Sequence, residues 1–281
     1  MILVTGATGH VGAELVTRLA AEGVQVRAMT RRPEATRFAR GVEVVEGDCE
    51  APESLRKAFE GVEGAFLMTS QATGSAKLHT AVQVDAAKAA GVRYVVKLSV
   101  ARGGEEGHPL VAAWHREDEG AVTESGIDFT MLRPGRFMSN TLGWKHMLAR
   151  GDTVYVPFAR KATTPIAPED IAAVAAEALT TDRFKNEVLE LSGAEVLTPE
   201  QELAIVGEIL NRELTLEEPS VEATIDGIAR SGMDRGLAAA MVEHVLQGSY
   251  GAEIWPTVER VLGRKPMTFQ QWAGKHFKEE A

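Results

Sequence analysis

The sequence is poor in cysteine, in positive charge and in long apolar runs. Cys49 is the only cysteine among 281 residues, so neither an intrachain disulfide nor a cysteine-based metal site can form. Lysine and arginine number 30 against 40 aspartate and glutamate residues, and the formal charge of −10 argues against binding to a nucleic-acid backbone. No apolar run approaches the roughly 20 residues that a membrane helix needs. These absences predict a soluble protein without a metal site, a nucleic-acid partner or a membrane anchor.

The composition is otherwise that of an ordinary globular chain. Hydrophobic residues make up 44% of it, which is enough for a proper core, and the length suits one large domain or a domain with a small lobe. Because residues 1–4 are expected to form a strand, we expect no signal peptide. We therefore expect a cytoplasmic protein that acts on a small molecule, in an oligomeric state that the sequence leaves open.

What the chain does have is a glycine-rich turn at its start. Residues 1–4 predict a parallel strand buried on both faces, and residues 11–22 predict an amphipathic helix. In such a turn one glycine allows a sharp bend, one lets a pyrophosphate approach the backbone, and one lets helix and strand pack closely. The free N–H groups of the helix N-terminus also attract phosphate. We therefore predict a dinucleotide site formed by Gly6, Ala7, Thr8, Gly9, His10, Val11 and Gly12.

The end of the next strand, at residues 25–30, indicates which dinucleotide is preferred. An NAD-binding chain usually places a carboxylate there to accept hydrogen bonds from the ribose. This chain has Arg31 and Arg32 instead, and the first carboxylate that follows is Glu34. Two guanidinium groups can hold a 2′-phosphate through charge-assisted contacts, although they could also be solvated loop charges. The pattern favours NADP, with NAD as the other possibility.

Strand-like and helix-like segments alternate along the first half of the chain. Such alternation requires a parallel sheet covered by helices on both faces, a doubly wound α/β fold in which ligands lie beyond the carboxyl ends of the strands. The further strands are expected at residues 42–46, 64–68, 92–100 and 129–133, and the further helices at 52–59, 77–90 and 110–125.

The second half is less regular. Strands are expected at 153–156 and 188–191, helices at 168–179 and after the capping residue Thr198, an extended piece at 213–217, and a wholly helical stretch at 221–277. We expect residues 1–150 to form the dinucleotide-binding domain. Residues 151–281 are expected to form a small α/β lobe, mostly helical at its end, that is interleaved with this domain and binds the substrate.

Several motifs together resemble one family. They are GATGHVG at 6–12, VEGDC at 45–49, VVKLSV at 95–100, WHREDE at 114–119, SGIDFTMLRPGRFMSN at 125–140 and PEDIAAV at 168–174. The chain resembles the NmrA-like branch of the atypical short-chain dehydrogenases/reductases over nearly its whole length. This resemblance implies a Rossmann domain with bound NADP or NAD. It also implies either a reductase of quinones, dyes or related compounds or a nucleotide-sensing regulator without chemistry.

The catalytic pattern of the parent superfamily is missing. That pattern is a Tyr-x-x-x-Lys pair with a serine, and none of the three tyrosines here is followed four residues later by lysine. The corresponding helix carries His115 and Glu119, which a spacing of four places on one face. A histidine oriented by a carboxylate is a candidate general acid near neutral pH. An ordinary helix-stabilising pair is an equally good interpretation.

Lys97 and Ser99 lie on one face of an otherwise apolar strand. A lysine there is costly unless it has a partner or lines a polar cleft. It could therefore contact cofactor or substrate, reach solvent, or pair with a carboxylate on a covering helix. By resemblance, Ser99 occupies the position of the superfamily's catalytic serine, close to the nicotinamide.

The remaining candidates lie at strand ends and in the lobe. By resemblance, Asp48 and Cys49 contact the adenine, although Cys49 also fits a small residue near a strand end better than a reactive thiol. The other cofactor candidates are Met68, Thr69, Ser70 and Pro134, and the substrate candidates are Phe137, Met138, Asn140 and Trp144. For the phenylalanine and methionine, plain core packing is at least as good an interpretation.

The sequence thus predicts an NAD(P)H-dependent oxidoreductase that transfers hydride to a quinone-like, dye-like or conjugated carbonyl compound. The alternative is a non-catalytic NADP-sensing protein of the NmrA type, which the missing Tyr-x-x-x-Lys pair supports equally well. An epimerase or dehydratase with tightly held NAD is disfavoured, because Arg31 and Arg32 replace the acidic ribose anchor.

Overall fold

The computed structural model describes residues 1–69, 76–101, 110–247 and 251–278. Within these residues seven strands form one parallel sheet in the order β3-β2-β1-β4-β5-β6-β8. Their bounds are Ile2–Val4 (β1), Val26–Thr30 (β2), Glu43–Glu46 (β3), Gly64–Leu67 (β4), Tyr94–Leu98 (β5), Asp128–Pro134 (β6) and Glu187–Leu191 (β8). The predicted doubly wound parallel sheet is confirmed, with the chain reversing its direction across the sheet between β1 and β4.

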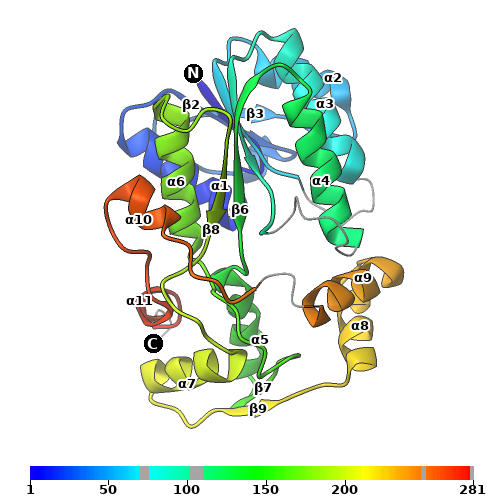
Figure 1. Ribbon diagram of the computed structural model, residues 1–281, viewed down its shortest axis with the longest axis vertical. Helices are drawn as coiled ribbons and strands as arrows, with labels where there is room; N and C mark the ends of the chain where they lie inside the picture. The colour runs from blue at the N-terminus through cyan, green and yellow to red at the C-terminus, as the bar shows by residue number, and fades with distance from the viewer. Residues whose placement is uncertain (70–75, 102–109, 248–250, 279–281) are drawn as a thin grey trace.

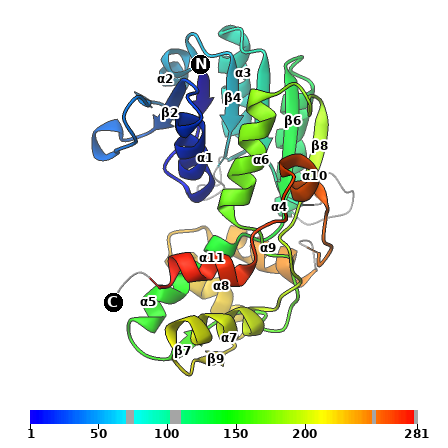
Figure 2. The same cartoon turned by 90° about the vertical axis from the view of Figure 1, so that its left-hand side faces the viewer.

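Helices cover both faces of this sheet (Figures 1 and 2). One face carries α1 (His10–Ala21), α6 (Pro168–Thr180) and α10 (Thr257–Leu262), and the other carries α2 (Pro52–Phe59), α3 (Ala76–Ala89) and α4 (Leu110–Thr123). Because side chains alternate along a strand, Val96 of β5 joins the apolar core under α1 and α6, whereas Val95 joins the core on the other face. Both valines are fully buried, as expected of a strand in a parallel sheet.

The chain leaves the sheet twice to build a lobe beyond the carboxyl ends of the strands (Figure 1). After β6 it forms η2 (Met138–Gly143), α5 (Trp144–Leu148) and β7 (Thr153–Tyr155), and after β8 it forms α7 (Pro199–Leu210), β9 (Thr215–Glu217), α8 (Val221–Arg230) and α9 (Arg235–Leu246). It then returns to the sheet through α10 and ends in α11 (Phe269–His276) on the lobe. Trp144, Leu203 and Trp272 are among the buried residues that form the lobe's own apolar core. The lobe therefore faces the edge where the strands end.

Two predictions about the second half have opposite outcomes. Thr198 caps α7 as expected: its side chain accepts a hydrogen bond from the N–H of Gln201, and the Gln201 side chain accepts one from the Thr198 N–H. The prediction of a wholly helical stretch at 221–277 is wrong, because non-helical segments precede and follow α10. Gly263 ends α10 with φ +66°, and prolines, which lack the N–H that continues a helix, stand at 256 and 266.

Two kinds of feature are missing from the part of the chain that the structure describes. No helix there has the length and apolar character needed to cross a membrane. In the same residues, no group of three or more histidine, cysteine or acidic side chains could hold a metal ion.

Candidate functional site

The glycine turn lies at the carboxyl end of β1, and the packing of α1 on this turn explains two of its glycines. Gly6 adopts φ +61°, a left-handed conformation that suits glycine. At Gly12 a Cβ would overlap the carbonyl oxygen of Gly6 and lie 3.0 Å from the Cα of Ala7. The N–H of Gly9 donates to the Gly6 carbonyl at 3.0 Å, which closes the turn. Glycine at 6 and 12 is therefore required by the fold itself.

Gly9 has no such explanation within the protein. A Cβ there would come no closer than 3.4 Å to another heavy atom, which is ordinary van der Waals contact, and its φ of −82° suits any residue. Gly9 is the N-cap of α1, and no side chain caps the first-turn N–H groups. These open N–H groups at the positive end of a 12-residue helix fit a dinucleotide diphosphate.

The other residues of the turn divide by exposure. Thr8 and His10 are exposed, so their side chains can reach a ligand or solvent. Ala7 and Val11 are buried in the core between the sheet and α1, so they offer a ligand only their backbone.

Arg31 and Arg32 follow β2, on the same edge of the sheet as the glycine turn. Both are exposed, and in the described residues neither guanidinium forms an ion pair. The N–H of Arg32 donates to the Thr30 hydroxyl at 3.3 Å, which fixes the start of this loop. Two exposed cations at this position fit the 2′-phosphate of NADP.

Cys49 and Asp48 follow β3. The Asp48 carboxylate accepts the N–H of Glu50 at 3.0 Å and so shapes the turn. Burial, together with the negative charge of Asp48, raises the pKa of the Cys49 thiol to about 11. The thiol therefore stays protonated at neutral pH, in keeping with a small packing residue and not with a nucleophile.

Met68 and Thr69 follow β4, and Ser70 lies outside the described residues. Met68 lies beside the glycine turn, where its Cβ is 3.2 Å from the position of a Cβ on Gly6. Its backbone N–H donates to Thr5 at 2.8 Å, which ties the ends of β1 and β4 together. The Thr69 hydroxyl donates to Asp118 of α4 at 3.1 Å.

Lys97 of β5 is fully buried and partnered. Its Nζ donates to the Leu98 carbonyl at 2.8 Å and to the Thr69 hydroxyl at 3.2 Å, and it lies 3.7 Å from an Asp118 carboxylate oxygen. Burial lowers the pKa of Lys97, while Asp118 and Glu119 act to raise it. Of the three interpretations of Lys97 from sequence, the one with a carboxylate partner on a covering helix is therefore the one that forms.

Glu119 does not orient His115, contrary to the sequence-based expectation. One of its oxygens accepts from the Ser99 hydroxyl at 2.5 Å and from Arg133 Nε at 2.9 Å, and the other accepts from Arg133 Nη2 at 2.6 Å. Arg133 also reaches Glu190 of β8 at 3.1 Å, and these carboxylates raise its pKa. The spacing of four correctly predicted a shared helix face, but the oppositely charged arginine on β6 binds the carboxylate.

His115 is also unsuited to be the protonated general acid that the sequence indicated. Burial, together with the neighbouring Lys97 and His244, lowers its pKa to about 3. The imidazole is therefore neutral near pH 7. A neutral ring can still form a hydrogen bond with a substrate oxygen, but it is a weak proton donor.

A cavity of about 350 Å³ lies against His115, with walls from both the sheet edge and the lobe. It is lined by Val100, His115, Arg136, Asn140, Thr141, Trp144, Val156, Pro157, Phe158, Lys161, Thr163, Pro199, Thr224, Ile228, Met241, Val242, His244 and Val245. Two of the four substrate residues expected from sequence, Asn140 and Trp144, are therefore on its wall.

The other two, Phe137 and Met138, are not on this wall, and that expectation needs correction. Met138 is 1% exposed within the lobe core, and Phe137 packs against the core between the sheet and α1. Pro134, one of the cofactor candidates, is buried at the end of β6, where its carbonyl accepts the N–H of Ala101 at 2.8 Å. Phe137 and Met138 pack into or against apolar cores. The sequence pattern cannot distinguish such core packing from contact with a ligand.

Sequence reasoning missed three charged or titratable residues of the cavity wall. Arg136 stands within the LRPGRFMSN element, so a cation beside the expected substrate residues was a usable signal. Lys161 and His244 gave no signal, because they come from a loop and a helix that are more than 80 residues apart in the chain.

Comparisons with known proteins agree with this geometry. A family model described as NAD(P)H-binding matches residues 6–182. The chain is 36% identical over 284 residues to a (4-alkanoyl-5-oxo-2,5-dihydrofuran-3-yl)methyl phosphate reductase of Streptomyces griseus, with 98% of each chain covered. It is 31% identical over 281 residues to an NAD(P)H azoreductase of Xenophilus azovorans, again with 98% of each covered.

Among solved structures, the NADPH-dependent quinone oxidoreductase of Escherichia coli in complex with NADPH superposes with a TM-score of 0.83 and 25% identity. The match covers 99% of this chain and 100% of that one. The chain belongs to the NAD(P)H-binding family, as the family match and the full-length relatives show. The glycine turn and the parallel sheet agree with this assignment.

Proposed function

We propose that the protein is an NADPH-dependent reductase of a small, flat, conjugated acceptor of the quinone, dye or conjugated carbonyl class. One observation carries this proposal. The open glycine turn at the end of β1 and the cavity beside the ends of β5 and β6 share one edge of the sheet. In open α/β sheets ligands bind at this edge, so a cofactor and an acceptor can meet there. The relatives named as reductases of a butenolide phosphate, azo compounds and quinones support the same class of reaction.

The cofactor would lie along the carboxyl edge. The backbone of residues 6–12 would hold the diphosphate, and Arg31 and Arg32 would hold the 2′-phosphate. When bound, the reduced nicotinamide supplies a hydride. The adenine half would contact Asp48 and Cys49, and the nicotinamide half would lie near Met68, Thr69, Ser70, Lys97, Ser99 and Pro134.

The residues around the acceptor would position it and keep water away. Trp144, Val156 and Phe158 give the cavity flat and apolar walls, and residues 151–281 supply most of its lining, which supports their role as a substrate lobe. His115, as a neutral imidazole, would bind an acceptor oxygen by a hydrogen bond. A quinone delocalises the incoming electrons, so a strong protein acid is less necessary, in keeping with the missing Tyr-x-x-x-Lys pair.

The test is oxidation of NADPH, followed at the nicotinamide absorbance band, with a panel of quinones, azo dyes and enones. Wild type should turn over at least one of these classes. Gly9→Asp should abolish turnover, because its carboxylate would stand where the diphosphate approaches, and it should still fold, because aspartate is a good N-cap.

His115→Gln should lower turnover without preventing NADPH binding. Tight binding of NADPH with no oxidation across the whole panel would reject the reductase proposal and favour the NADP-sensing alternative.

A further inference from the structure

The charges on the cavity wall are of one sign. Arg136 and Lys161 both line the cavity, whereas none of the described lining residues is an aspartate or a glutamate. The chain as a whole carries a formal charge of −10, so a cationic wall runs against its overall charge. The wall therefore favours a negatively charged ligand.

Of the two cations on the cavity wall, Lys161 has no carboxylate partner among the described residues, whereas Arg136 has one. Its Nζ donates to the carbonyls of Val245 and, at 2.6 Å, Leu246 at the C-terminal end of α9. An ammonium group carries three N–H donors, so one donor remains beyond these two carbonyls. Desolvation lowers the pKa of Lys161, and a nearby anion would offset this cost. Lys161 thus places a positive charge on the wall, and its third N–H can donate a hydrogen bond to a ligand.

Arg136 is held in place by groups behind the wall. One guanidinium nitrogen donates to the fully buried Glu202, and Nε donates to the Thr163 hydroxyl at 3.1 Å. The remaining nitrogen, Nη1, makes no hydrogen bond within the described residues and is not fully buried, so it can donate to a ligand. The buried carboxylate balances the charge of Arg136, so this residue contributes a fixed donor, and Lys161 contributes the net charge.

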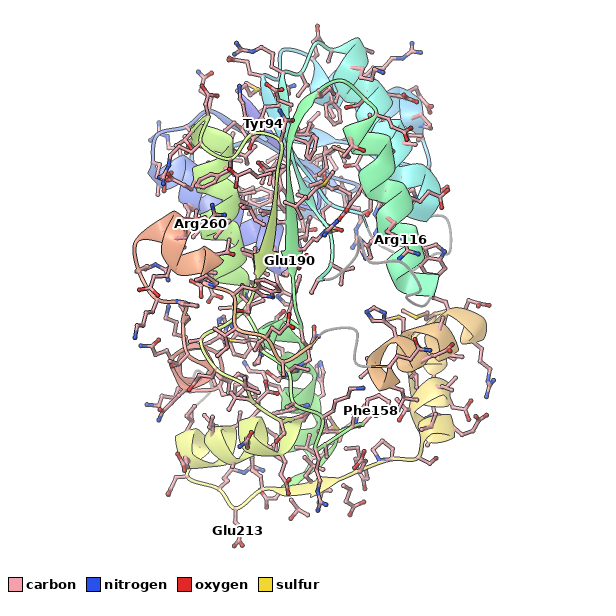
Figure 3. All side chains as sticks on the ribbon, in the orientation of Figure 1. Tyr94, Arg116, Phe158, Glu190, Glu213 and Arg260 are labelled. Atoms are coloured by element: carbon pink, nitrogen blue, oxygen red, sulfur yellow. The ribbon has the colours of Figure 1, made fainter. Side chains whose placement is uncertain are left out.

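The loop that carries Lys161 has a strained backbone. Phe158 adopts φ +57°, which is rare for a bulky residue, and its carbonyl accepts the N–H of Lys161 at 2.9 Å. Phe158 also lines the cavity and packs against the α8–α9 pair (Figure 3). Such strain persists where the surroundings hold it, and it clusters at ligand sites. Here it turns the chain so that an aromatic ring and an ammonium group reach the same cavity.

From these contacts we infer that the acceptor of this reductase is an anion, with a flat apolar body against Trp144 and Phe158 and one acidic group against Lys161 and Arg136. The acidic group is a carboxylate, a sulfonate or a phosphate. This inference rests on the proposed function and narrows its substrate class. Because the net charge of the protein repels anions at long range, selection must come from these short contacts, where the low dielectric strengthens charge pairing.

The experiment measures binding of inert probes, so that it does not depend on turnover. Naphthalene-2-sulfonate, 2-naphthoate and 2-naphthyl phosphate are compared with the uncharged 2-naphthamide by calorimetry, with NADP⁺ at saturation. Wild type should bind at least one anion about tenfold more tightly than the amide. The anion that binds most tightly identifies the acidic group. Equal binding of anions and amide, or no binding of any anion at millimolar concentration, would overturn the inference.

Variants assign the preference to Lys161. Lys161→Gln keeps a donor for the α9 carbonyls but removes the charge, so the tenfold preference should fall to about twofold or less. Lys161→Arg should retain it. Arg160→Gln is the matched control, because it removes a charge one residue away on a side chain that is 88% exposed and outside the cavity.

The inference is also wrong if Lys161→Gln keeps the full preference while Arg160→Gln loses it. The proposed function is judged separately. Turnover of neutral acceptors without preference for anions would reject the inference alone. Anion-selective binding without NADPH oxidation by any acceptor would reject the reductase.

Discussion

Two regions meet at the carboxyl edge of the sheet, and they are built on opposite principles. The glycine turn at residues 6–12 offers a ligand mainly backbone N–H groups and carries no ionisable core residue. A few strands away, β5, α4 and β6 hold a charge network of two neighbouring ion pairs, Lys97 with Asp118 and Arg133 with Glu119. Three of these side chains are buried, and Arg133 is partly buried. In Figure 3 Glu190, which joins this network, lies at the same end of the sheet as the lobe.

The two regions should respond to different kinds of substitution. A backbone site depends on space, so added atoms should harm it while charge changes elsewhere should not. A buried charge network depends on complete pairing, because removing one partner leaves another charge buried without compensation. Single substitutions in each region therefore separate a loss of space from the loss of a charge partner.

Glu119→Gln should give the largest loss of stability. Arg133 would lose its doubly bonded carboxylate, and Lys97 would lose a favourable neighbour. We expect the free energy of unfolding, measured with urea, to fall by about 3 kcal/mol. Glu124→Gln, an exposed change just after the same helix, should stay within about 0.5 kcal/mol of wild type. Equal losses in the two variants would show that the network contributes nothing specific.

Gly12→Ala and Gly9→Ala should separate folding from binding within the turn. The methyl group at Gly12 overlaps backbone, so we expect a loss of about 2 to 3 kcal/mol in unfolding free energy. At Gly9 the methyl group has room, and the loss should be less than about 1 kcal/mol.

NADPH affinity, measured by fluorescence titration, should nevertheless fall in Gly9→Ala, because its methyl group faces the phosphate approach. An undiminished affinity in this variant would contradict the assignment of Gly9 to the cofactor.

The double variant Arg31→Ala, Arg32→Ala should change cofactor choice and leave folding intact. Both side chains are exposed, and no ion pair is lost among the described residues. NADPH should bind about 30-fold more weakly, which corresponds to about 2 kcal/mol, while NADH binding should change little. Calorimetry with NADPH and with NADH measures both affinities. Equal losses of affinity for the two nucleotides would contradict a 2′-phosphate site at Arg31 and Arg32.

The two regions also differ in how well the sequence predicted them. The glycine turn is local: strand, turn and helix lie within 21 residues, and each glycine has a spacing that implies its role. The partner of Glu119 could not be read in this way, because Arg133 becomes its neighbour only through the packing of α4 on β6. The same reason hid Lys161, whose contacts on α9 lie 84 and 85 residues away. Strand ends predict where a site lies, but tertiary contacts decide which side chains line it.

His115 allows the finest test of the contrast, through the pH dependence of stability. Its pKa is about 6.5 when unfolded and about 3 when folded, so the unfolded chain binds the extra proton between these values. Stability should therefore be fully present above pH 6.5 and should fall as the pH decreases toward 3. The contribution of this one group amounts to about 1 kcal/mol between pH 8 and pH 6.

In His115→Asn this part of the slope should vanish, whereas His146→Asn, which replaces an exposed histidine on α5, should retain it. Urea unfolding at pH 6 and pH 8 measures both. If His115→Asn and wild type lose the same stability over this range, the pKa of His115 is not lowered in the folded protein. His115 would then again be a candidate general acid near neutral pH.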